Sequence, residues 1–211
     1  MGLNAIMTAI RRGTTNEERS LQVNEKGELL HAQGLPRYTE MARKGQGWQA
    51  MNTTALASLV VRPSTVANFT LFNNEPEGGP SYIIDRAFAF QLVSTAAAGY
   101  HSLWLCVHKK GLVSPTADIT AIKGLSGKAN YGGKAVCDTA MTVIDDGWFP
   151  FGPILGVEAV GVLPGGILEA LIEGRIIVPP QCGVSTQVVG AVAGNTFTSG
   201  FAWYEEQLAI E

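Results

Sequence analysis

Turn residues divide most of this chain into short apolar or alternating segments. From Trp48 onward, clusters of Gly, Pro, Asn and Asp separate one such run from the next. Runs bounded in this way are typical of β-strands. Strands are expected at residues 55–61, 67–73, 81–94, 102–110, 134–144, 167–178, 184–193 and 198–209. Because no long intervening segment repeats every 3.6 residues, the sequence predicts an all-β domain, either a jelly roll or a two-sheet β-sandwich.

Two neighbouring strands near the C-terminus are unusually apolar. Residues 174–190 read GRIIVPPQCGVSTQVVG, with one charge at the start and none after it. Pro179 and Pro180 end the first strand because neither has a backbone N–H to donate. Strands that are apolar on both sides are normally covered on both sides. One cover is the second sheet of the sandwich. A second copy of the chain is expected to supply the other, in an oligomer for which we favour a trimer over a dimer.

The composition also predicts an assembly protein. Charged residues make up 16% of the 211-residue chain, whereas about 25% is typical. A neutral surface of this kind is characteristic of interfaces. The net charge of -3 argues against a general nucleic-acid binder, which normally carries a strongly basic surface.

Residues 1–50 differ from the rest in being polar and rich in turn residues. Such a segment cannot form a core alone, so we expect a partly helical or extended N-terminal arm, followed by a β domain at residues 51–211. The arm holds seven Lys and Arg among residues 1–47, with five acidic residues offsetting them. Contact with protein is therefore favoured over contact with nucleic acid. The expected assembly contacts are Arg11, Arg12, Arg37, Tyr38, Arg43, Lys44 and Trp48.

A second set of interface residues is expected in the β domain. The aromatic side of residues 81–94, with Tyr82, Phe88 and Phe90, is predicted to face the core. Arg86 falls on the same side, where an unpaired charge would cost several kcal/mol, so it must reach a partner, a strand end or a subunit boundary. The aromatic group after residue 147 is rarely left bare on a monomer. The predicted interface comprises Arg86, Trp148, Phe149, Phe151, Ile177 and Val178.

No pattern in the sequence predicts catalysis. Cys106 and His108 share one face of a predicted strand, but no metal-type spacing of Cys or His occurs. The segment GLSGKANYGGKA resembles a phosphate loop, yet it has five residues where that motif has four between Gly127 and Gly133, and Ala135 follows its lysine. We expect no enzyme activity, no cofactor and no metal.

The same sequence gives no sign of export or membrane insertion. Three cysteines without framework spacing indicate synthesis in a reducing compartment. The first residues lack the order of a secretory signal, and no apolar run reaches the roughly 18 residues of a membrane span.

Several segments resemble uncharacterised virion proteins of tailed bacteriophages. They are LPRYTEMARKGQGWQAMNTTALASLVVRPSTVANFTLFNNEPEGGPSYIIDRAF, PTADITAIKGLSGKANYGGKA, DDGWFPFG and EGRIIVPPQCGVSTQVV, within about residues 34–208. The resemblance lies in overall pattern. It implies a small, charge-poor β-sandwich or jelly roll that assembles as a trimer on a capsid or tail, and it implies no catalytic residue.

These observations lead to one expected function and one alternative. The chain is expected to be a homotrimeric decoration or cement protein of a phage head, made in the host bacterial cytoplasm. Its partners would be its own copies and the major capsid protein or another virion protein. The alternative is a receptor-binding or carbohydrate-binding module of a tail or fibre, with Trp148, Tyr100 or Tyr131 stacking on a sugar.

Overall fold

The computed structural model describes residues 39–93, 99–111, 115–116, 119, 122–127, 130–157 and 166–208. The chain divides into two compact units, residues 1–39 and 40–211, and every described strand belongs to the second. The elements are α1 (Thr39–Arg43), β1 (Gly47–Met51), β2 (Leu56–Ala57), β3 (Phe69–Asn73), β4 (Ser81–Val93), β5 (Gly99–His108), β6 (Lys123–Gly124), β7 (Ala135–Thr139), β8 (Phe149–Val157), β9 (Ile167–Val178), β10 (Gly183–Gly190) and β11 (Thr196–Glu206). Within the described part of the chain, no helix is long and apolar enough to cross a membrane.

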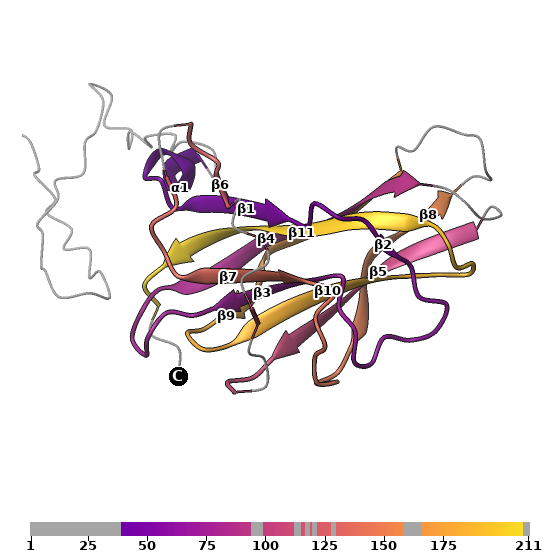
Figure 1. Cartoon of the computed structure of the whole chain (residues 1–211). Helices are drawn as coiled ribbons and strands as arrows, with labels where there is room; N and C mark the ends of the chain where they lie inside the picture. The colour runs from indigo at the N-terminus through magenta and orange to yellow at the C-terminus, as the bar shows by residue number, and fades with distance from the viewer. Residues whose placement is uncertain are drawn as a thin grey trace, which may run out of the picture. The chain divides into compact units, whose positions relative to one another are not determined.

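The strands form two antiparallel sheets (Figure 1). One sheet has the order β6-β1-β11-β4-β9, with β2 also paired to β11, and the other has the order β7-β3-β10-β5-β8. Without the additional strands β2, β6 and β7, the order along the chain is first-eighth-third-sixth in one sheet and second-seventh-fourth-fifth in the other. This is the strand order of a jelly roll. The predicted all-β sandwich is therefore confirmed.

The hydrophobic core lies between the inner faces of the two sheets. Phe69 of β3 and Phe201 of β11 come from opposite sheets, and their ring centroids are 5.8 Å apart. Tyr82 and Trp203 are also fully buried there. Phe201 and Trp203 occupy alternate positions of β11, so their side chains lie on the same face of the sheet.

The strand β4 reverses its alternation at a β-bulge between Ile84 and Arg86. Before the bulge, Tyr82 and Ile84 point into the core, as the sequence predicts. After the bulge, Ala87 and Ala89 are the buried residues and the next aromatic side chains point outward. The prediction that Phe88 and Phe90 face the core is therefore wrong, because one extra residue moves all later side chains to the other face.

The second face of β10 is covered by the same chain, not by a second copy. Residues 183–188 of this strand are all buried. The cover consists of residues 64–67 and 141–148, where Val143 and Trp148 pack with Cys106 of the neighbouring strand β5. Trp148 Nε1 donates a hydrogen bond of 3.1 Å to the Ser64 carbonyl. The expectation that an identical neighbour shields β10 is thus corrected, since two connecting segments already bury it.

The same cover is fastened by an ion pair at its rim. Arg62 donates two hydrogen bonds to the Asp145 carboxylate, of 2.6 and 3.0 Å. These hydrogen bonds lower the pKa of Asp145 to about 2. The two covering segments are also joined by a backbone hydrogen bond of 2.9 Å from Val143 to Thr65.

The first strand begins inside the segment that the sequence assigned to the arm. β1 starts at Gly47, and Trp48 and Ala50 are buried in the core. The Trp48 ring meets the edge of Tyr131 with centroids 4.8 Å apart. The sandwich therefore starts before residue 51.

Replacing the covering tryptophan tests this account of β10. Trp148→Ala is expected to lower the free energy of unfolding by about 3–5 kcal/mol, because a large buried side chain leaves a cavity. It should also raise the rate at which a thiol reagent labels Cys106. Urea unfolding and timed thiol labelling measure the two effects. Phe149→Ala is the control, since Phe149 is 36% exposed and should change both quantities less. An unchanged labelling rate would contradict the assigned cover.

Candidate functional site

The outward side of the β1-β11-β4-β9 sheet carries a row of apolar side chains that no described element covers. We call this surface the outer face. Its apolar members are Met51, Phe88, Phe90, Leu92, Ile167, Leu171 and Ile177. Ile167 and Leu171 are 55% and 56% exposed. Apolar surface gathered in this way on one sheet is characteristic of interaction sites.

A trough of about 460 Å3 runs along the outer face. Its floor is β11, which places only small side chains there: Gly200 lies opposite Met51 and Phe88, and Ala202 lies opposite Gln49 and Arg86. A Cβ atom at Gly200 would come within 2.2 Å of the Ala50 carbonyl oxygen, so no larger residue fits. The trough is therefore a consequence of small residues between two strands with long side chains.

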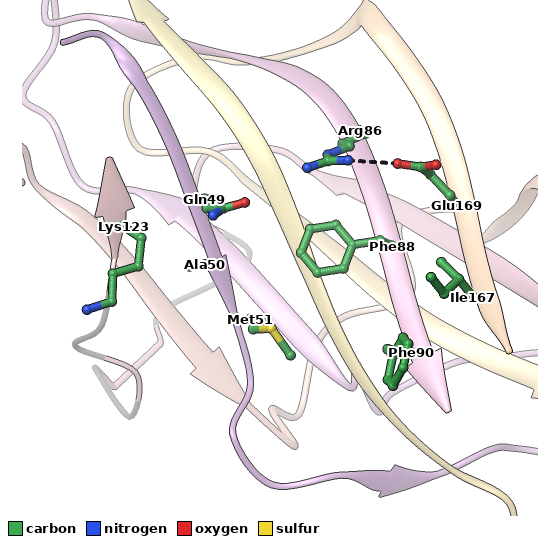
Figure 2. A pocket seen from close by; sticks show the side chains of 9 residues that line it. All are labelled: Gln49, Ala50, Met51, Arg86, Phe88, Phe90, Lys123, Ile167 and Glu169. Carbon is green, nitrogen blue, oxygen red and sulfur yellow. Dashed lines mark hydrogen bonds and ion pairs between the residues drawn. The ribbon is translucent and has the colours of Figure 1, made fainter. Parts of the chain in front are cut away.

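One aromatic ring reaches across this floor. Figure 2 shows the Phe88 ring projecting from β4 toward Gln49 and Met51 of β1, with Phe90 beside it. Ile167 of β9 also lines the trough. A large apolar surface with a few polar groups at its border is the usual composition of a binding site.

The polar border of the trough contains an ion pair between adjacent strands. Arg86 Nη1 of β4 donates a hydrogen bond of 2.9 Å to Glu169 Oε1 of β9 (Figure 2). The same guanidinium lies 5.7 Å from the centroid of Phe88. Both charged side chains remain about two-fifths exposed, so the pair stabilises the fold by at most about 1 kcal/mol. Lys123 of β6 adds a second cation at the opposite side.

The predicted arm residues have different positions. Arg11, Arg12, Arg37 and Tyr38 lie outside the described residues. Arg43 ends α1 and Lys44 follows it, and both are exposed. Trp48 is 5% exposed, so its ring belongs to the core and is not available to a partner.

The predicted interface residues of the β domain divide into two groups. Arg86 and Ile177 are on the outer face, and Phe149 is partly exposed on β8. Trp148 and Val178 are buried, at 4% and 0% exposure, so they stabilise the fold and cannot contact a second molecule. Phe151 is half-buried against the core, with the Arg175 guanidinium 5.2 Å from its ring centroid.

Cys106 and His108 meet, but in a site that is closed to solvent. Cys106 Sγ is 3.8 Å from His108 Nδ1, and His108 Nε2 is 2.8 Å from Ser185 Oγ. Burial raises the pKa of the Cys106 thiol and lowers the pKa of the His108 imidazole. All three residues are completely buried. A neutral thiol without access to solvent is an inert core group and not a nucleophile.

In the segment that resembles a phosphate loop, a glutamate side chain accepts a hydrogen bond from the backbone. The Lys134 backbone N–H donates a hydrogen bond of 3.0 Å to Glu75 Oε1. A carboxylate already occupies the position next to this backbone, which disfavours a phosphate there. Among the described residues, no group of three or more His, Cys, Asp or Glu side chains could hold a metal ion.

Comparisons of the chain with protein-family models, curated proteins and solved structures found no match.

Most of the trough was missed by sequence reasoning. Gln49 and Ala50 lie in the segment assigned to the arm, and Phe88 and Phe90 were assigned to the core. The sequence does contain one useful signal, because Arg86 interrupts an apolar alternation that would otherwise bury it. A charge in that position is compatible with a bulge.

A half-buried carboxylate at one end of the core gives a pH-dependent prediction. Tyr131 donates a hydrogen bond of 3.0 Å to Glu205 Oε1, and burial raises the pKa of Glu205 above its ordinary value. At pH values between the ordinary pKa of a glutamate and the raised pKa of Glu205, the folded state holds more protons than the unfolded state. The free energy of unfolding should therefore fall as pH rises through this window. Glu205→Gln keeps an oxygen acceptor and should flatten that slope.

Urea unfolding between pH 4 and 8 measures this effect, with Glu206→Gln as the control on the neighbouring residue. If the two variants and the original chain have the same slope, Glu205 does not titrate differently on folding.

Proposed function

We propose that this protein is a homo-oligomeric structural component of a bacteriophage particle, and that it decorates and cements the head. The single observation that supports this proposal most is the uncovered apolar outer face, in a jelly-roll fold that viral capsid domains also use. The closed burial of the Cys106 site favours a role without catalysis. The predicted three-fold symmetry of the oligomer is part of the proposal.

The proposed mechanism is mechanical. A decoration protein buries neutral surface against neighbouring subunits, and each contact adds cohesive free energy to the shell. At about 25 cal/mol per Å2 of buried apolar area, the exposed side chains of the outer face provide several kcal/mol per contact before the costs of association. Such contacts would resist the outward pressure of packaged DNA.

Self-association through the outer face can be tested with one charge. Leu171→Glu should raise the dissociation constant of the oligomer by about tenfold to a hundredfold, because a carboxylate would be desolvated at the centre of an apolar contact. Light scattering and sedimentation at several concentrations measure the mass. Val61→Glu is the matched control, since Val61 is a similarly exposed apolar residue on the segment between β2 and β3. A single-copy mass of the original chain at high concentration would contradict self-association.

The location in a particle needs a separate experiment. Purified protein is expected to bind phage heads that lack their decoration and to leave tails unlabelled, as seen by immunogold electron microscopy. Labelling confined to tail tips would contradict the decoration role and support the alternative below.

The trough supports one second candidate, a carbohydrate-binding module. The Phe88 ring lies across the trough with Gln49, Arg86 and Glu169 around it, and aromatic rings with bordering hydrogen-bond groups suit a sugar. Trp148 is buried, and the Tyr131 hydroxyl is engaged with Glu205, so neither is favoured as the platform. Tyr100 is 70% exposed and remains a candidate. Glycan-array binding that Phe88→Ala abolishes would support this function over decoration.

A further inference from the structure

We propose that the outer face binds the same face of a second copy about a two-fold axis, with Arg86 of each copy against Glu169 of the other. This inference rests on the proposed self-association and specifies the contact that produces it. It names the surface, the partner and the symmetry.

The charges on the outer face are self-complementary. Arg86 and Glu169 are neighbours on β4 and β9, with Phe88 directly opposite Glu169 in the register of the two strands. A two-fold axis midway between a positive and a negative group places each over its opposite in the other copy. The two pairs then form a square of alternating charges. A face with a single sign of charge would repel itself in the same arrangement.

The exposed area is sufficient for a stable pair. At about 4.8 Å between strands, the outer face spans roughly 33 Å along β11, β4 and β9 and roughly 17 Å along the five residues of β1, which is about 550 Å2 in projection. A standard interface buries about 800 Å2 of accessible surface per partner, and accessible surface exceeds projected area because side chains protrude. The apolar side chains Leu171, Ile167 and Met51 surround the ion pair on this face. Two sheet faces of this size pack as the layers of a sandwich do.

Pairing by the face is favoured over pairing by the edge of the sheet. The edge strand β9 is interrupted between the residues that pair with Arg86 and Ile84, where Glu173 and Gly174 adopt positive φ angles of 52° and 80°. Arg175 then donates hydrogen bonds to the carbonyls of Leu171 and Ile172. On the other side, β6 pairs with β1 at Trp48 and Gln49. Bulges and occupied carbonyls prevent strand addition, so the face is the remaining surface of this sheet.

A two-fold contact has a consequence for stoichiometry. Both copies use the same residues, so each outer face is satisfied by one partner and the oligomer has an even number of chains. The contact is compatible with the expected three-fold symmetry only in a six-chain assembly, in which two trimers meet face to face.

The decisive experiment exchanges the charges. Arg86→Glu gives a face with two acids, and Glu169→Arg gives a face with two bases. Each variant alone should raise the dissociation constant of the pair at least about tenfold, because like charges are opposed across the contact. An equimolar mixture of the two should form mixed pairs with an affinity similar to that of the original chain. The double variant, with both substitutions in one chain, should pair with itself again.

Sedimentation and native mass spectrometry measure these masses, and circular dichroism verifies that each variant is folded. The control exchanges are Glu77→Arg and Lys110→Glu, because this exposed pair joins the connections after β3 and β5 and lies outside the outer face. Those variants should form oligomers of the same mass as the chain without substitutions, both alone and when mixed.

The outcomes separate the two proposals. If the chain without substitutions has the mass of a monomer, the proposed self-association itself is overturned. An oligomeric original chain whose mass survives both single exchanges, or whose variants fail to form mixed pairs, overturns the two-fold contact only. An odd number of chains in the oligomer overturns it as well.

Discussion

The bulge in β4 decides what this protein presents to its surroundings. Because of the extra residue between Ile84 and Arg86, two alanines enter the core and Phe88 and Phe90 leave it. Fully burying a phenylalanine is worth about 1.5–3 kcal/mol, so leaving two of them partly exposed forfeits part of that free energy in the isolated chain. The same shift brings Arg86 beside Glu169 on the outward side. The Phe88 side of the trough and the ion pair both follow from this extra residue.

The outward sides of the two sheets differ in how they are covered. The sheet that contains β10 is covered by residues 64–67 and 141–148, which are fastened by Arg62 and Asp145. The sheet that contains β4 has no such cover among the described residues, although its outward side is at least as apolar. The chain can thus bury an outward face with its own connections and does so on one sheet. On the other sheet, we propose that a second copy of the chain supplies the equivalent cover.

The sequence predicted the strands better than the faces. The bounds of β9 match the expected run at residues 167–178, and β3, β4, β5, β10 and β11 match within a few residues. β8 was missed because Pro150 interrupts it, which an edge strand tolerates. β1 was missed because its glycines look like a stop signal. The predicted orientation of Phe88 is wrong because of the bulge in β4. A bulge depends on how a strand pairs with its neighbours, here β11 and β9, and the alternation within one strand carries no information about that pairing.

In the proposed contact, the ion pair on the outer face affects the relative position of the two copies more than their affinity. Desolvating Arg86 and Glu169 in a contact costs about as much as their mutual attraction returns. Apolar side chains on two flat sheets, however, can slide past one another with little loss, since burial depends on area and not on direction. The charges favour the arrangement in which each also meets its complement in the other copy, because every other arrangement buries the ion pair of each chain without this additional contact. In a chain with 16% charged residues, a charge pair inside an apolar surface is thus suited to selecting one arrangement among many.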